Sequence, residues 1–269
     1  MGGTLLQYYF TKERITEESQ RDNTNDSVIV SLKNQIKGCL SSKYWVMIMI
    51  VMCMYYLSNA VSVNGMLYYA NWVVGTYNDG VTLSLLNIIG QAMLGPGVII
   101  IWPMIKKIGK RKTFISLGII SVIGGIVGLL NATTLSAALG ALTIRSIGAL
   151  PAVYVTSSVL ADALDHVEWK CGYRCDGFSS SIYSIIITVS AGFGLGILNL
   201  GLSLTGYVAP NADGTWIAQS QAVQDWCTFA TFGFPAISSL VIVMIFILFD
   251  LEKRLSQMQK DIQDRSASK

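Results

Sequence analysis

Charged residues are scarce in this sequence: Asp, Glu, Lys and Arg make up 13% of its 269 residues, against 52% hydrophobic residues. A soluble domain of this size carries roughly a quarter charged residues, because its surface helices need a polar, water-facing side. No charged residue occurs in five long stretches, at 44–78, 80–105, 113–144, 177–212 and 226–249. This composition excludes a soluble globular domain and favours a membrane protein.

The sequence also has a single histidine, His166, and lacks the motifs of common hydrolases and metalloenzymes. It contains no H-E-x-x-H, no G-x-S-x-G and no phosphate-binding G-x-x-x-x-G-K-[ST]. Cys171 and Cys175 lie near His166, but their C-x3-C spacing differs from that of zinc knuckles. We therefore expect no catalytic residue, no metal site and no cofactor of enzymatic chemistry.

The uncharged stretches are long enough to be transmembrane helices. A bilayer core about 30 Å thick needs roughly 20 apolar helical residues. Residues 113–161 exceed one span, and the polar NATTLS stretch at 131–136 supplies a turn between two. The sequence thus predicts an all-α membrane protein with six transmembrane helices, over about 45–70, 81–104, 113–131, 135–161, 178–206 and 227–249. Within them, the pairs Gly124/Gly128 and Gly192/Gly196 are typical of close helix packing.

Lysine and arginine indicate which side of the membrane is cytoplasmic. The predicted inner segments are 1–43, 106–112, 162–177 and the tail after Asp250, and they hold six, five, two and five of these residues. The predicted outer loops hold none. We therefore expect a cytoplasmic leader (1–43), a bundle of six spans (44–250) and a cytoplasmic tail (251–269). The basic residues flank spans, where they meet anionic lipid, and they do not indicate nucleic acid binding.

The leader contains a further periodic segment. Val28, Leu32, Ile36 and Leu40 recur at helical spacing among polar residues. This pattern predicts an amphipathic helix that lies on the inner membrane surface.

Arg145 is the only charged residue inside a predicted span. It lies about ten residues from the outer end, or roughly 15 Å deep by the helical rise. An arginine at this depth costs several kcal/mol unless it faces water or a partner. Either it is a cavity-facing cation that meets substrate, or it makes a structural contact with a helix carbonyl or carboxylate, or it extends outward. Asp162 is roughly 25 Å away on the same helix, so the partner must be a substrate, the backbone or another polypeptide.

A second group of charges follows the fourth span in the segment SSVLADALDHVEWKCGYRCDG, residues 157–177. Asp162 and Asp165 are three residues apart, so they share one helical face. At the helix C-terminus they would oppose the helix dipole, and Arg174 or the basic 106–112 loop could relieve this repulsion. The cluster is either an ionic latch at the mouth of a transport path or an ordinary solvated loop.

The segment SSVLADALDHVEWKCGYRCDGFSSSIYSI, followed by LSLTGY, resembles the glycoside–pentoside–hexuronide:cation symporters, the melibiose permease family of the major facilitator superfamily. Their pattern is an A-D-x-x-D helix end, a short loop, an R-x-[ED] pair and a later G-Y. The matching residues here are Ala161, Asp162, Asp165, Arg174, Asp176, Gly206 and Tyr207. YFTKERITEE, YYANWVVG and PMIKKIGKRKTF resemble other family segments in the same order, so the resemblance covers about residues 5–250.

This resemblance implies the carboxy-terminal half of a 6+6 transporter, because family members have twelve spans in two six-helix halves. It implies alternating-access symport of a sugar or glycoside with sodium or a proton. The coupling cation would be held mainly by the other half. The implied partners are the sugar, the lipid bilayer and a matching amino-terminal half, and the implied location is a cell membrane, the bacterial inner membrane in particular.

The resemblance also implies site residues. Tyr183, Ser184, Ile187 and Thr188 would face the sugar from the eleventh span, and Val153 and Tyr154 from the tenth. Thr188 replaces a lysine and Val153 replaces a stacking tryptophan of melibiose permeases, which argues against melibiose as the substrate. Arg145 would supply a cation that suits a uronic acid. Asp162, Asp165 and Arg174 would form a cytoplasmic gate that pairs with cations of the other half.

Two other functions remain compatible with the residues. The chain could be a half-size carrier that acts as a homodimer, or a membrane scaffold or remnant that transports nothing.

Overall fold

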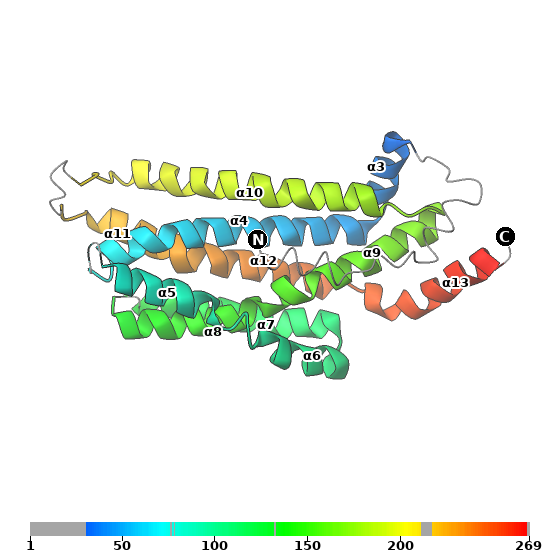
Figure 1. Cartoon of the computed structure of the whole chain (residues 1–269), viewed down its shortest axis with the longest axis horizontal. Coiled ribbons are helices and arrows are strands. Elements are labelled where there is room, and N and C mark those ends of the chain that lie inside the picture. The colour runs from blue at the N-terminus through cyan, green and yellow to red at the C-terminus, as the bar shows by residue number, and fades with distance from the viewer. Residues whose placement is uncertain (1–30, 76, 78, 132, 211–216, 268–269) are drawn as a thin grey trace, which may run out of the picture.

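Six helical segments that are long and apolar enough to cross a membrane run along the long axis of the protein (Figure 1). The computed structural model describes residues 31–75, 77, 79–131, 133–210 and 217–267. The six candidate spans are Lys43–Trp72, Gly80–Ile108, Lys110–Asn131, Leu135–Cys171, Asp176–Leu204 and Gln221–Leu248. Within these described ranges there is no strand. The predicted all-α class with six candidate membrane spans is therefore confirmed, whereas the predicted 1–30 part of the leader lies outside the described residues.

Three spans are single helices and three are interrupted. The single helices are α4 (Lys43–Trp72), α7 (Lys110–Asn131) and α10 (Asp176–Leu204). The second span consists of α5 (Gly80–Ala92) and α6 (Gly97–Ile108), and the fourth of α8 (Leu135–Tyr154) and α9 (Thr156–Cys171). The sixth consists of α11 (Gln221–Thr228), the π-helical turn η1 (Phe229–Gly233) and α12 (Phe234–Leu248). Outside the spans are α3 (Leu32–Ser41), the 3₁₀ turn η2 (Leu251–Lys253) and α13 (Leu255–Ala267).

Proline lies at or near each interruption. Proline has no backbone N–H, so the carbonyl four residues earlier loses its α-helical donor. Pro96 separates α5 from α6, Pro151 lies in the last turn of α8, and Pro235 follows the π-helical turn. Pro103 lies inside α6, which nevertheless continues to Ile108.

The fourth span extends further than the predicted 135–161. Its second part, α9, continues to Cys171 and ends where Gly172 adopts the left-handed conformation, with φ 79°. Asp162 and Asp165 therefore lie inside α9, and the expected placement of both carboxylates at the helix C-terminus is wrong. The helix dipole acts mainly on groups in the last turn. The last turn of α9 contains Lys170, whose positive charge favours this helix end.

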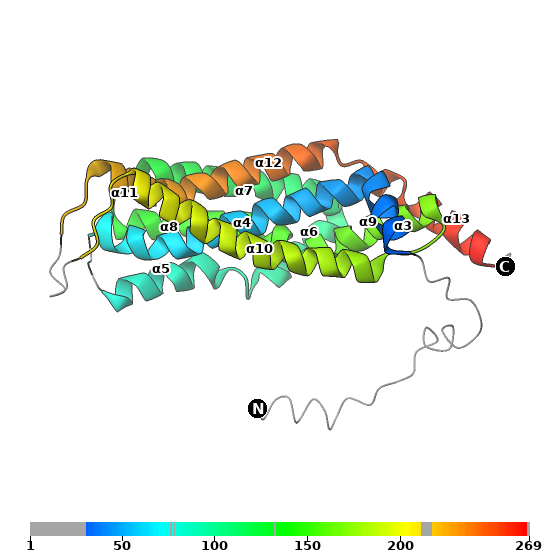
Figure 2. The same cartoon turned by 90° about the horizontal axis from the view of Figure 1, so that it is seen from above.

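The bundle is arranged around α4. This helix packs against α10, α12, α5 and α9, and Figure 2 shows α12 and α5 on opposite sides of it. The helices α3 and α13 lie at the same end of the bundle (Figure 1) and both contact α9. In α3, Leu32 and Leu40 are exposed while Gly38 and Cys39 are buried. The position of this helix on a membrane surface stays a prediction, and Val28 of the predicted segment lies outside the described residues.

Glycines allow the closest helix contact, which joins α7 to α8. A methyl group at Gly148 would lie 2.3 Å from the backbone nitrogen of Ser121, and one at Gly124 would lie 2.6 Å from that of Arg145. The predicted role of Gly124 in packing is thus supported by the structure. The predicted pair Gly192/Gly196 instead faces open space, and Gly194 makes the contact of α10 with α4.

We predict that Gly148→Ala destabilises the protein, whereas Gly192→Ala does not. The added methyl group at position 148 meets backbone atoms that cannot move aside, and such overpacking costs about 1–3 kcal/mol. At position 192 the methyl group meets nothing within 4 Å. Thermal unfolding of both variants in detergent measures the difference, and equal midpoints would show that the α7–α8 contact is not tight.

Candidate functional site

A cavity of about 130 Å³ lies inside the bundle, between α4, α5, α7, α8 and α12. Its lining is rich in small polar groups and contains the buried arginine of the sequence analysis. The polar lining residues are Tyr55, Ser58, Asn59, Ser62, Gln91, Ser121, Arg145, Ser146, Ser238 and Ser239. None of the lining residues is Asp, Glu or Lys, so Arg145 is the sole formal charge of the cavity wall.

Arg145 is held by a backbone carbonyl of the sixth span. Its Nη1 donates to the carbonyl oxygen of Thr231 at 2.7 Å and to Oγ of Ser62 at 2.6 Å. Ser62 also donates to the Thr231 carbonyl at 3.1 Å. This carbonyl needs side-chain donors because the residue four positions later is Pro235, which has no N–H to offer. The structure thus shows that Arg145 makes a structural contact with a helix carbonyl, which was one of the roles expected from the sequence.

Other breaks and crossings near the cavity are bridged in the same way. Tyr154 Oη donates to the carbonyl of Leu94, in the turn between α5 and α6. Ser238 Oγ of α12 donates to the carbonyl of Met54 at 2.8 Å, and Ser121 and Ser239 are hydrogen-bonded at 2.9 Å. These contacts join five spans around the cavity without any ion pair.

None of the six residues predicted to face the sugar from the fourth and fifth spans lines this cavity. Tyr183, Ser184, Ile187 and Thr188 lie on α10, where Tyr183 and Tyr56 of α4 form a hydrogen bond of 2.6 Å between their hydroxyls. Ser184 and Thr188 are exposed and donate to carbonyls of α10 itself, while Ile187 is partly buried. Val153 is 37% exposed and lies beside Tyr154 at the end of α8.

Asn59, Gln91 and Tyr55 of the cavity were missed by sequence reasoning. Isolated Asn and Gln residues in apolar spans are the available signal, but nothing in the sequence connects Asn59 to Gln91 or Arg145.

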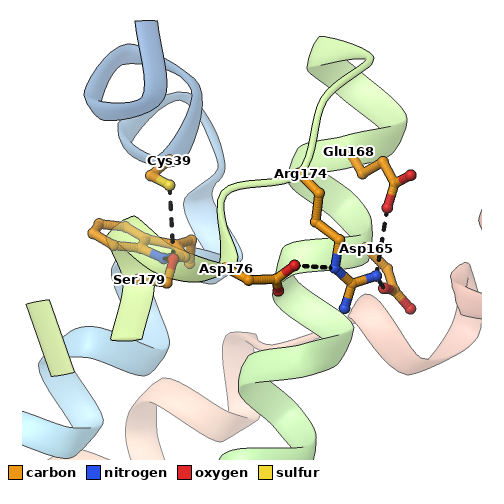
Figure 3. Close-up of polar contacts among 7 residues, drawn as sticks. Cys39, Asp165, Glu168, Arg174, Asp176 and Ser179 are labelled. Carbon is orange, nitrogen blue, oxygen red and sulfur yellow. Dashed lines mark hydrogen bonds and ion pairs between the residues drawn. The ribbon is translucent and has the colours of Figure 1, made fainter. Parts of the chain in front are cut away.

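Two of the three predicted cytoplasmic gate residues, Asp165 and Arg174, lie next to each other beside α9 (Figure 3). Arg174 Nη1 pairs with Asp165 at 2.9 Å and with Glu168 at 3.4 Å, and its Nε pairs with Asp176 at 2.6 Å. Burial of the guanidinium disfavours its charge, but the carboxylates, Asp176 foremost, outweigh this and raise the pKa of Arg174 above its ordinary value. Asp165 also accepts a hydrogen bond from Gln259 of α13 at 3.0 Å.

Asp162 pairs with a cation of the basic loop rather than with Arg174. Lys110 Nζ lies 2.5 Å from its Oδ2, and both side chains are largely buried, with exposed fractions of 24% and 16%. The three predicted gate residues therefore have partners within this chain, on α7, α9, α13 and the α9–α10 loop.

Two reciprocal helix caps complete this end, and sequence reasoning missed both. The Glu252 carboxylate accepts the backbone N–H groups of Lys110 and Arg111 at 3.0 and 3.3 Å, at the N-terminus of α7. Arg111 in turn donates to the carbonyls of Phe246 and Ile247, at the C-terminus of α12. Each charge has the sign that favours its helix end. Asp250 accepts a hydrogen bond from Tyr44, which holds the pKa of Asp250 below its ordinary value.

The cysteines and His166 are parts of this packing. Cys39 lies against Ser179 (Figure 3), and burial raises the pKa of Cys175 to about 12, so its thiol is protonated at neutral pH. His166 Nδ1 is 2.9 Å from the hydroxyl of Ser42. In the part of the chain that the structure describes, no three His, Cys, Asp or Glu side chains are grouped to hold a metal ion.

Comparison with known proteins identifies relatives of this chain. A family profile described as MFS/sugar transport protein matches residues 1–253. The chain is 25% identical over 267 residues to the isoprimeverose transporter of Lactiplantibacillus pentosus, a match that covers 96% of this chain and 51% of that protein. It is 29% identical over 127 residues to the glucuronide carrier protein homolog of Escherichia coli K12, covering 47% of this chain and 26% of that protein. The chain thus spans about half the length of the first relative.

We predict that the Lys110–Asp162 pair stabilises the contact of α7 with α9. Asp162→Lys alone places two cations together and should lower the unfolding free energy by about 2 kcal/mol, between the values for exposed and buried pairs. The exchanged double variant Lys110→Asp, Asp162→Lys should recover at least half of this loss. Thermal unfolding of the three proteins tests the pair, and no recovery in the double variant would contradict it.

Proposed function

The chain belongs to the MFS/sugar transport protein family, whose members are membrane transporters and not enzymes. We propose that it works as the carboxy-terminal six-helix half of a cation-coupled sugar or glycoside symporter. The observation that carries this proposal is the alignment of 96% of the chain, with its six spans, to 51% of the isoprimeverose transporter. In a transporter built from two six-helix bundles, the substrate lies between the bundles near the midplane. The counterpart would be an amino-terminal six-helix half, which would hold most of the cation site.

The proposed sugar-binding face consists of exposed hydroxyl and aromatic groups of α10, α4 and α8. Ser184, Thr188 and the Tyr56–Tyr183 pair can exchange hydrogen bonds with sugar hydroxyls, because a hydroxyl both donates and accepts. Val153 and Tyr154 would bound the face on α8, and Ile187 would contact apolar ring carbons. Thr188 and Val153 lack the charge and the large ring of the melibiose permeases, so a substrate other than melibiose is favoured.

The proposed gate works by exchange of ion partners. In the described structure Asp162 is paired with Lys110, and Arg174 with Asp165. When the substrate path opens outward, cations of the counterpart half would approach these carboxylates and close the cytoplasmic side. Alternating access needs contacts that differ in strength between the two states, and partly buried pairs satisfy this requirement because both their attraction and their desolvation cost change with burial.

We predict sugar uptake when the chain is reconstituted with an amino-terminal six-helix half of an isoprimeverose transporter, under an inward sodium or proton gradient. The labelled substrates should include isoprimeverose and a glucuronide, because the relatives are named for these compounds. Uptake by the chain without a counterpart would favour the homodimeric carrier instead. Absence of uptake under every condition, from protein that unfolds cooperatively, would favour the non-transporting scaffold.

We also predict that Asp162→Arg reduces gradient-driven uptake by at least tenfold, because the gate then carries the wrong sign at a carboxylate that is only 16% exposed. Asp264→Lys is the matched control, since Asp264 is an exposed tail residue outside the ion pairs of the described chain. Equal uptake by the two variants would mean that the charge cluster is an ordinary solvated loop.

A further inference from the structure

We propose that the cavity beside Arg145 binds a monovalent anion, either a small inorganic anion such as chloride or the carboxylate of an acidic sugar. The cavity lies inside the six-helix bundle and is lined from five helices. It is therefore separate from the exposed face of α10 that we propose for sugar hydroxyls. Only the carboxylate form of this inference rests on the proposed transport function.

The first observation is a positive charge without a counter-charge. Arg145 forms no ion pair with any described residue, and its two hydrogen-bond partners, Ser62 and the Thr231 carbonyl, are both neutral. Every other lysine and arginine of the sequence lies outside the six predicted spans. An arginine inside a membrane bundle is costly unless it faces water or an opposite charge. A bound anion in the cavity supplies that charge.

The second observation is how the guanidinium is oriented. Nη1 carries both of its hydrogen bonds, so among the described contacts Nε and Nη2 of Arg145 keep their N–H groups for another acceptor. Because the Pro235 break leaves the Thr231 carbonyl in need of a donor, one end of the guanidinium is fixed to η1 through this carbonyl and to α4 through Ser62. The planar fork of arginine matches a carboxylate in a bidentate arrangement, and its orientation is set before an anion arrives.

The third observation is a set of neutral donors that face the same cavity. Tyr55, Ser58, Asn59 and Gln91 line it, and none of these side chains has a hydrogen-bond partner among the described residues. Hydroxyl and amide groups donate to anions, and no lining carboxylate repels one. Asn59 and Gln91 are exposed, which places these donors at the mouth of the cavity. A volume of about 130 Å³ accommodates chloride with water, or a carboxylate whose sugar ring extends through the mouth.

The inference is tested by anion-dependent stabilisation of the purified full chain in detergent. Thermal unfolding is followed while sodium chloride or sodium glucuronate replaces sodium MOPS, whose anion is bulkier, at constant ionic strength, or while neutral methyl glucoside is added to sodium MOPS. A ligand that binds only the folded state raises its stability as the ligand concentration passes the dissociation constant. We expect chloride or glucuronate to raise the unfolding midpoint of the natural chain. Any shift caused by methyl glucoside, which has no charge to pair with Arg145, should be the same in Arg145→Gln.

The variants assign the effect to Arg145. Arg145→Gln can still donate to the Thr231 carbonyl but has no charge, and it should need at least tenfold more anion for the same shift. Arg145→Lys keeps the charge without the fork and should bind anions with intermediate affinity. Lys106→Gln is the control, because it removes an exposed cation that lies over the ring of Trp102, far from the cavity lining. It should respond to anions as the natural chain does.

Each outcome decides a point. Stabilisation by both anions shows that the charge alone suffices, and stabilisation by glucuronate alone assigns the site to an acidic sugar. No anion effect on the natural chain, or an undiminished effect in Arg145→Gln, overturns the inference. Should Arg145→Gln fail to fold, the pair Asn59→Ala and Gln91→Ala must weaken the anion effect for the inference to stand. Uptake of neutral isoprimeverose by the natural chain with its counterpart half is measured separately, and such uptake would leave the transport proposal intact after a failure of the anion inference.

Discussion

A backbone carbonyl inside a bilayer has no water to bind, so every break in a spanning helix must be met by a donor from the protein. Two such breaks determine how this bundle is assembled. Pro235 deprives the Thr231 carbonyl of its helical donor, and Arg145 and Ser62 replace it. The turn between α5 and α6 exposes the Leu94 carbonyl, and Tyr154 replaces its donor. In both cases the replacement comes from α8 or α4, so the breaks also connect spans that are distant in the sequence.

This constraint explains why the structural and functional interpretations of Arg145 are compatible. A lysine could satisfy the Thr231 carbonyl, but as a single ammonium group it would bring no second, fixed set of donors. Arginine has five N–H groups in a rigid plane, so one edge can complete the bundle while the other faces the cavity. The Pro235 break thus holds a cation at one position and in one orientation, which is what a binding site requires of its charged group.

The sequence predicts the spans well for two reasons. Their lengths follow from the thickness of the bilayer, and their lack of charged residues follows from the low dielectric of the bilayer core. It predicts the end of the fourth span poorly, because the first charged residue after the apolar stretch, Asp162, is paired within the bundle and the helix continues past it to Cys171. Arg145 is conspicuous in the sequence, but its partner Thr231 is 86 residues away and depends on tertiary packing. The Gly192/Gly196 pair shows the same limit: glycine spacing predicts a smooth helix face, whereas only the fold determines that Gly194 faces α4 and its neighbours do not.

The cavity and the α9 end of the bundle are held together by different forces. At the α9 end, ion pairs and the reciprocal caps of Glu252 and Arg111 join α7, α9, α12 and α13. Each of these charges has a partner within the chain, so a counterpart half that takes over one carboxylate, as the proposed gate requires, must compete with an existing ion pair. Around the cavity the spans are joined by neutral hydrogen bonds, and the single charge lacks a described counter-ion. Rocking of one bundle against another needs a rigid body, and it needs a ligand that interacts more strongly with one state than with the other. The paired charges of the α9 end connect four helices, whereas the unpaired charge of Arg145 is the group with which the anion that we propose would interact.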